Sequence, residues 1–247
     1  MATANPAMDE GVYNRALSFD RNPARTMTMT GSVAKSALLV AILLATGGYT
    51  WQLSQSESGL SIGLLIAGAL GGLITALITI WFPKASPITA PIYAALEGVV
   101  LGAISAFFET RFPGIVLQAA GLSVGTLTVM LFLYGTGIIR VTEKFTIGLV
   151  AATGAVALVY LVDIVARMFG TGIPYIHESG LVGIGFSLVV VVIAALNLIL
   201  DFDFIHQGVR RGAPKYMEWY AGFSLLVTLV WMYLEILRLL AKLRGRD

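Results

Sequence analysis

The chain contains no cysteine, and this absence excludes disulfide frameworks, iron–sulfur clusters and thiolate zinc sites. Charged residues are also scarce, at 12% of 247 residues, and 16 Lys and Arg against 14 Asp and Glu leave a formal charge of +2. Nucleic-acid binding needs a larger basic excess, so no nucleic-acid partner is expected. The two histidines, His177 and His206, are not spaced as metal ligands, and no metal site or resident cofactor is expected.

Apolar residues are what the sequence has in abundance. They make up 57% of the chain, and the mean hydropathy is +0.84, which is too apolar for an ordinary water-soluble domain. A membrane span needs about 20 apolar residues, so there is room for six or seven helices and short loops. The runs are continuous and lack the alternation of a barrel strand, which predicts an all-α membrane protein in contact with the lipid bilayer.

Long gaps between charged residues mark the expected spans. The seven gaps and apolar runs are Lys35 to Glu57, Glu57 to Lys84, Ile88 to Phe108, Arg111 to Arg140, Phe145 to Val165, Leu181 to Leu200, and Met217 to Leu240. The sequence therefore predicts a polytopic bundle of seven transmembrane helices over residues 35–241. Residues 1–34 are expected to form a flexible cytoplasmic tail, and residues 242–247 a short basic tail.

The distribution of Lys and Arg predicts that the N-terminus is cytoplasmic, because basic loops stay on that side. With this orientation the expected outer loops hold only Arg111 and Arg167. Seven spans nevertheless place the basic end of the chain outside, against the rule. Either the last helix is an exception, or the last segment is re-entrant and does not fully cross.

Small residues recur at helix-packing spacing. Three Gly-x-x-x-Gly pairs are present: Gly68 with Gly72, Gly98 with Gly102, and Gly121 with Gly125. Such pairs let two helix backbones approach closely. We expect them to pack within the bundle rather than to form a dedicated dimer contact.

Ionisable residues inside the expected spans are candidates for function, because a charge in hydrocarbon costs about 2.5 to 3.5 kcal/mol. Glu97 is the deepest acid, near the middle of its span, with Gly98 beside it. Asp163 lies four residues before Arg167, so the two share a helical face and are expected to form a structural ion pair. Every such charge needs a partner or a purpose.

The densest polar cluster begins at Asp201, where the sixth apolar run stops. If the helix continues, Asp203, His206 and Arg210 share one face, and Asp201 points nearly opposite Asp203, so one acid faces the bundle interior. The cytoplasmic end is expected to gather one network that joins the sixth and seventh helices. Its expected members are Asp201, Asp203, His206, Arg210, Arg211 and Glu218. Protonating an acid there weakens its salt bridge, which is how a pH gate is built.

The last apolar run carries a second polar face. Thr228 and Glu235 are seven residues apart and share it, and Glu235 is placed to pair with Arg238 three residues later. The residues expected to form the gate, the pH sensor or the ion pathway are Asp201, Asp203, Glu97, Glu218, Thr228, Glu235 and Arg238. Enzyme signatures are missing: Gly222-Phe223-Ser224 is followed by Leu225 rather than glycine, and no zinc-protease or phosphate-binding motif occurs. We therefore expect a protein that is not an enzyme.

The region from Leu198 to Leu240 resembles the Bax-inhibitor (YccA-like, TMBIM) family of seven-helix membrane proteins. The resemblance is carried by Leu-Ile-Leu-Asp-Phe-Asp-Phe-Ile, by Glu-Trp-Tyr-Ala at residue 218, and by Tyr-Leu-Glu-Ile-Leu-Arg-Leu-Leu at residue 233. Glu97-Gly98 with Gly102 resembles the family's polar-glycine segment. The resemblance covers roughly residues 30 to 241 in the number and order of spans. It implies a divergent bacterial branch of a family described as pH-sensitive calcium leak channels with an aspartate pair as sensor.

Carried over by position, Asp201 matches the sensor aspartate of the sixth helix, and Arg238 matches the basic residue near the family's C-terminal end. The place of the second aspartate falls on Thr228, which cannot ionise. Asp203 and Glu218 are the candidates to supply the missing acid, with Glu97 facing them across the bundle.

The leading hypothesis is a multi-pass protein of the inner membrane that passes or senses cations, with transient calcium, under control of protonation at Asp201 and its neighbours. Two rivals remain. One is a non-catalytic regulatory protein that binds a membrane protease or another integral partner. The other is an intramembrane enzyme, which would need a nucleophile and a base within hydrogen-bonding reach.

Overall fold

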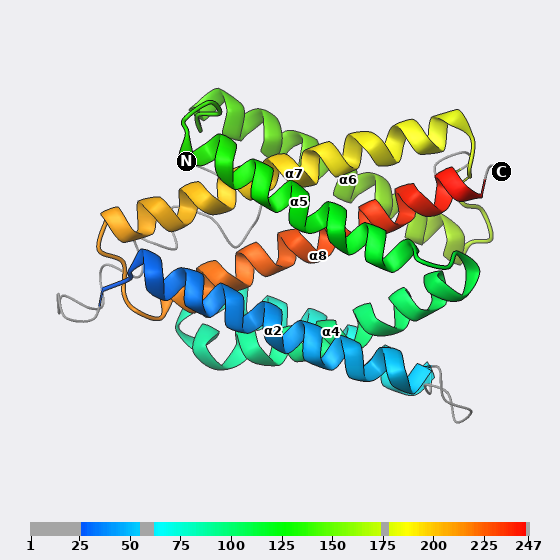
Figure 1. The fold of residues 1–247 in the computed structure, drawn as a ribbon, viewed down its shortest axis with the longest axis horizontal. Coiled ribbons are helices and arrows are strands. Elements are labelled where there is room, and N and C mark those ends of the chain that lie inside the picture. The colour runs from blue at the N-terminus through cyan, green and yellow to red at the C-terminus, as the bar shows by residue number, and fades with distance from the viewer. Residues whose placement is uncertain (1–25, 55–61, 174–177, 246–247) are drawn as a thin grey trace. The chain divides into compact units, whose positions relative to one another are not determined.

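The computed structural model describes residues 26–54, 62–173 and 178–245, and within these ranges the secondary structure is helical apart from one isolated β-bridge between Thr26 and Pro214. The helices are α2 (Met29–Ser54), α3 (Ile62–Trp81), the 3-10 helix η3 (Pro83–Ala85), α4 (Ser86–Arg111), α5 (Ile115–Gly135), α6 (Glu143–Met168), α7 (Leu181–Arg210) and α8 (Met217–Arg244) (Figure 1). The prediction of an all-α fold is confirmed. The first 25 residues of the expected tail lie outside the described residues, as do Glu57, His177 and Arg246.

Six of the described α-helices are long and apolar enough to cross a membrane. The exception is α3, whose apolar stretch Leu65–Trp81 is shorter. Helices suit this environment because each satisfies its backbone N–H and C=O groups internally, where no water is present to do so. The chain is therefore a multi-pass membrane protein.

Three helix boundaries differ from the apolar runs. Helix α2 begins at Met29, inside the expected tail, and α7 continues from Leu200 to Arg210, so the polar cluster is helical. Gly212, with a φ of +64°, follows at the turn after α7. Helix α8 runs unbroken for 28 residues to Arg244. At 1.5 Å per residue it is about 42 Å long, which is enough to cross a hydrocarbon layer about 30 Å thick; that it crosses fully stays a prediction.

The chain divides into two compact units. In the described residues, unit 1 comprises 112–173, 178–200 and 228–245, and unit 2 comprises 26–54, 62–111 and 201–227. Helices α7 and α8 each contribute one part to unit 1 and another to unit 2. The charged and polar side chains of interest fall in both.

In unit 2, α4 packs against both α2 and α3, and Figure 1 shows α2 alongside α4. Glycines make the α2–α4 contact possible. A Cβ atom on Gly98 would lie 2.0 Å from Thr46 Oγ1 and 2.4 Å from the carbonyl oxygen of Leu43, and one on Gly102 would lie 2.2 Å from the carbonyl oxygen of Gly47. The two backbones are thus in direct contact, as the Gly-x-x-x-Gly spacing predicts.

Unit 1 is held by polar side chains that reach between its helices. Asn197 of α7 donates to Thr153 Oγ1 of α6 at 2.9 Å. At the end of α8, Lys242 donates to Ser187 Oγ at 2.8 Å, and Arg244 to Gln118 Oε1 at 2.9 Å. These basic residues at the last turns are therefore bound to α7 and α5.

The glycine pairs do not all behave alike. Gly68 and Gly72 of α3 face α4, where a Cβ on Gly68 would lie 3.2 Å from Val100. A Cβ on Gly121 or on Gly125 of α5 would meet no atom of the described residues within 4 Å. The expected packing within the bundle is absent for this third pair over the described part of the chain.

Candidate functional site

Asp201 is a buried carboxylate of α7, with 1% of its surface exposed. Asp201 is the first residue of the part of α7 that belongs to unit 2, and the helix continues beyond it through the polar cluster. Its Oδ1 accepts a hydrogen bond of 3.0 Å from Ser224 Oγ, which is fully buried in α8. This contact joins α7 to α8 at the acid that the sequence singled out.

Ser224 was not among the expected site residues. It precedes Thr228 by four residues on the same helix, so the two share a face, and Thr228 is buried as well. The family resemblance places the second aspartate at Thr228; one turn earlier, Ser224 donates the hydrogen bond to Asp201 Oδ1. A small polar residue in an otherwise apolar run was the available signal.

The remainder of the polar cluster follows α7 toward its end. Asp203 accepts a hydrogen bond from the Gln207 amide, and Arg211 donates to Gln207 Oε1 at 2.9 Å. Asp203 is half-buried, while His206 and Arg210 are exposed. The inference that one of the two aspartates faces the interior is confirmed, and the interior one is Asp201.

Glu218, at the start of α8, is buried with 1% of its surface exposed. Its Oε1 accepts hydrogen bonds from the Thr28 backbone N–H at 2.9 Å and from Thr28 Oγ1 at 2.8 Å, and it forms an ion pair with Lys215 Nζ at 2.8 Å. The expected single network is therefore wrong for Glu218, whose partners are Thr28 and Lys215. The reason is that α2 begins early: residues 26–28 lie beside the α7–α8 connection, where Met27 N donates to the carbonyl of Ala213 at 2.6 Å.

Glu235 is the buried acid of unit 1, with 1% of its surface exposed. The predicted pair with Arg238 is present, with Arg238 Nη1 2.8 Å from Glu235 Oε1. The Tyr160 hydroxyl of α6 lies 2.9 Å from both carboxylate oxygens, and the Arg238 guanidinium lies over the Tyr160 ring at 5.3 Å. This carboxylate thus has a cation and a phenol as partners, and Tyr160 is a partner that sequence reasoning missed.

Asp163 and Arg167 of α6 form the ion pair that their spacing predicts, with 2.8 Å between Arg167 Nε and Asp163 Oδ2. Asp163 is 3% exposed and also accepts a hydrogen bond of 3.0 Å from the backbone N–H of Ile173. The pair therefore fixes the chain that follows α6 onto the last turns of that helix.

Glu97 lies midway along α4 and is partly buried. Its Oε2 faces α3, 3.4 Å from the position that a Cβ on Gly72 would occupy. Tyr93, one turn earlier and 6% exposed, packs its ring edge-on against Phe223 at 5.0 Å. Glu97, the acid predicted to lie deepest in the membrane, therefore faces Gly72 of the neighbouring helix α3.

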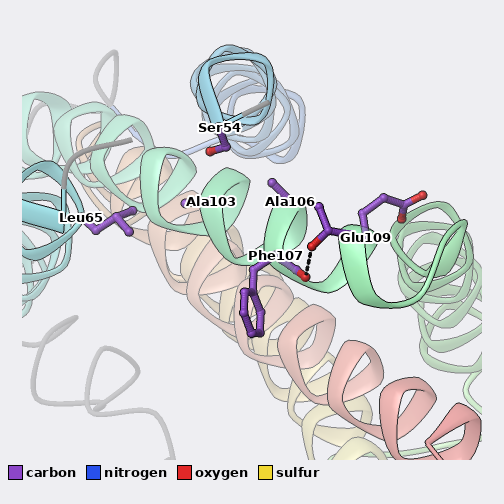
Figure 2. Close-up of a pocket in the computed structure, with 7 residues that line it drawn as sticks. Ser54, Leu65, Ala103, Ala106, Phe107 and Glu109 are labelled. Atoms are coloured by element: carbon purple, nitrogen blue, oxygen red, sulfur yellow. Dashed lines mark hydrogen bonds between the residues drawn. The ribbon is translucent and has the colours of Figure 1, made fainter. Parts of the chain in front are cut away.

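An open hollow with a volume of about 700 Å³ lies near the C-terminal end of α4. Figure 2 shows it between the ends of α2, α3 and α4. Its lining residues are Ser54, Leu65, Ala103, Ala106, Phe107, Glu109 and Thr110. None of the expected site residues is among them, and within the described ranges no three His, Asp or Glu side chains are grouped to hold a metal ion.

Comparison with known proteins agrees with the resemblance found in the sequence. A family model described as Bax inhibitor 1 like matches residues 5–245, which is nearly the whole chain. A search of curated proteins found no match. The helical membrane fold, the buried acids of α7 and α8 and this match lead to one assignment: the chain belongs to the Bax inhibitor 1-like family.

Proposed function

We propose that this protein passes cations, with calcium as the transported ion, across the inner membrane of a bacterial cell, and that protonation of Asp201 controls the passage. Membership of the Bax inhibitor 1-like family supports a membrane role. The observation that carries the proposal is the buried contact between Asp201 and Ser224, which joins α7 to α8. In this proposal calcium is the passing ion and no cofactor is resident.

The contact couples protonation to helix packing. An ionised Asp201 accepts the Ser224 hydrogen bond as an anion, whereas a protonated Asp201 becomes a donor itself and its bond to Ser224 changes. A buried polar contact of this kind has two arrangements, and titration selects between them. Because the acid is buried at a helix–helix contact, its protonation is felt by both helices.

The other acids have different roles in this proposal. Glu235 with Arg238, and Asp163 with Arg167, are structural pairs because each carboxylate already has a permanent cation as partner. Glu218 holds the start of α2 against α8 through Thr28. Asp203 continues the polar face of α7 toward Arg211 through Gln207.

The proposal is tested by calcium efflux from vesicles that contain the full-length protein, measured with a trapped calcium dye over a range of pH. We expect efflux above that of protein-free vesicles, with a dependence on pH that Asp201→Asn removes. Thr128→Ala is the matched control, because the Thr128 hydroxyl is exposed and bonds only a carbonyl of its own helix. Efflux equal to that of empty vesicles, or an Asp201→Asn variant with an unchanged pH profile, overturns the proposal.

A further inference from the structure

Glu97 occupies a position where a charged side chain is costly. It follows Ser86, the first residue of α4, by 11 positions and precedes Arg111, the last, by 14. At 1.5 Å per residue it lies about 16 and 21 Å from the two helix ends, and so near the middle of a hydrocarbon layer about 30 Å thick. An ionised carboxylate at this depth needs a compensating positive charge.

The described residues do not provide that charge. No hydrogen bond or ion pair reaches the Glu97 carboxylate from any of them. The titratable group closest to it on its own helix is the Tyr93 phenol, which brings no positive charge. In this respect Glu97 differs from Asp163, Glu218 and Glu235, each of which has a cationic partner.

The charged groups of the other helices in unit 2 do not bond Glu97. Helix α3 has no ionisable residue between Ile62 and Trp81. On α2, the Lys35 ammonium lies over the ring of Trp219 at 4.9 Å. The remaining charged groups of this unit outside α4 are Lys84 of η3, Arg211 and Lys215 of the α7–α8 connection, and Asp201, Asp203, His206, Arg210 and Glu218 of α7 and α8. No hydrogen bond or ion pair joins any of them to Glu97.

The helix opposite Glu97 presents a glycine to the carboxylate. Residue 72 of α3 is a glycine, and a single methyl group there would already be in van der Waals contact with Glu97 Oε2, at 3.4 Å. A larger side chain would occupy the space next to the carboxylate. The arrangement therefore combines an acid at membrane depth, the absence of a bonded cation over the described ranges, and a glycine without a side chain opposite the oxygen.

We propose that Glu97 binds a cation, either a proton or a small metal ion, between α3 and α4 in the middle of the membrane. The bound cation supplies the positive charge that the described residues lack, and the absence of a side chain at Gly72 leaves that side of the carboxylate uncovered by a larger residue. This site is separate from the Asp201–Ser224 contact and does not depend on the protein being a calcium leak.

The test is labelling of the full-length protein with dicyclohexylcarbodiimide, an apolar reagent for protonated carboxyl groups in membranes. The carboxyl O–H adds across one C=N bond of the reagent, and the adduct rearranges to an N-acylurea without loss of any atom. Mass spectrometry of the peptide that contains Glu97 gives the rate of labelling as pH, calcium and sodium are varied. A rate that changes with pH alone identifies the proton as the ligand, and a rate slowed by calcium or sodium identifies a metal ion.

Two variants test the geometry. We expect Glu97→Gln to abolish the label on this peptide and Gly72→Leu to lower its rate severalfold, while Gly63→Leu, at a position of α3 with open space around it, leaves the rate unchanged. Size-exclusion chromatography confirms that each variant folds. The proposal is overturned if Glu97 in folded wild-type protein stays unlabelled across the pH range, or if Gly72→Leu labels as fast as wild type. Labelled Glu97 in a protein without calcium efflux would contradict the proposed function alone.

Discussion

The two units of the chain treat a membrane-embedded glutamate in opposite ways. In unit 1, Glu235 is enclosed by Arg238 at 2.8 Å and by the Tyr160 hydroxyl at 2.9 Å. In unit 2, Glu97 faces a glycine of the neighbouring helix and has no bonded cation among the described residues. One acid has its counter-charge built into the protein, and for the other we propose that a bound cation supplies it.

The same contrast appears in how the helices are held together. Unit 1 uses side chains that reach between helices, such as Asn197 to Thr153. Unit 2 brings α2 and α4 together through glycines whose backbones touch, at Gly98 and Gly102. Helix α4 also packs against α3, where Gly68 and Gly72 face it. We infer that the Glu235–Arg238 and Asp163–Arg167 pairs of unit 1 are structural, whereas Glu97 of unit 2, which has no bonded cation among the described residues, is able to change its protonation.

The largest effect is expected from Gly98→Leu, which attacks the glycine contact of unit 2. Even a Cβ at this position would lie 2.4 Å from the backbone carbonyl oxygen of Leu43, which cannot move aside cheaply. We expect a loss of about 3 kcal/mol or more in the free energy of unfolding, or failure to fold. Thermal unfolding in detergent measures this. Gly48→Leu is the control, since Gly48 has open space around it, and equal losses in the two variants would refute the packing role.

Glu235→Ala tests the ion pair of unit 1. It removes the acceptor of both Tyr160 and Arg238, and we expect a loss of about 2 kcal/mol in unfolding free energy. The figure is moderate because the Arg238 side chain is 41% exposed and regains water. Glu143→Ala, which removes an exposed acid from the first turn of α6, should cost less than about 1 kcal/mol. An unchanged melting temperature for Glu235→Ala would show that this pair is not structural.

Ser224→Ala removes one hydrogen-bond donor from Asp201. A buried carboxylate that loses a donor is destabilised, and we expect about 1 to 2 kcal/mol in the free energy of unfolding. Calcium efflux measured on the same protein should show an altered pH profile, because the group that Asp201 bonds is gone. A variant with wild-type stability and a wild-type pH profile would mean that the α7–α8 contact does not control passage.

Glu97→Gln is expected to have the smallest effect on stability, within about 0.5 kcal/mol of wild type. The amide has nearly the same shape, and no hydrogen bond or ion pair in the described residues is lost. Thermal unfolding of Glu97→Gln and Glu235→Gln should be measured in parallel, because only Glu235→Gln breaks an ion pair, the one with Arg238. A loss of more than about 1 kcal/mol for Glu97→Gln would show that this acid has a structural partner.

The sequence predicts the helical membrane architecture and the local ion pairs well, because both depend on spacing along one helix. The pairs Asp163–Arg167 and Glu235–Arg238 follow from residues four and three positions apart, and both are present. Contacts between helices far apart in the chain do not follow from such spacing. Ser224 with Asp201, and Tyr160 with Glu235, are separated by 23 and 75 residues.

Glu218 is a second example of a contact that spacing along one helix does not predict. Its neighbours in sequence suggested a network with the end of the sixth helix, but its partner Thr28 is 190 residues away. The segment that holds Thr28 is polar and precedes the first apolar run, so hydropathy alone assigned it to a loose tail. Only the fold shows that residues 26–28 meet the start of α8.

The most direct test of the account is calcium efflux as a function of pH for Asp201→Asn and Glu235→Gln measured side by side in vesicles. The account predicts that Asp201→Asn makes efflux independent of pH, while Glu235→Gln keeps the wild-type pH profile at whatever level of folded protein remains. Equal loss of the pH dependence in both variants, or its survival in Asp201→Asn, would contradict the claim that Asp201 is the acid that controls passage.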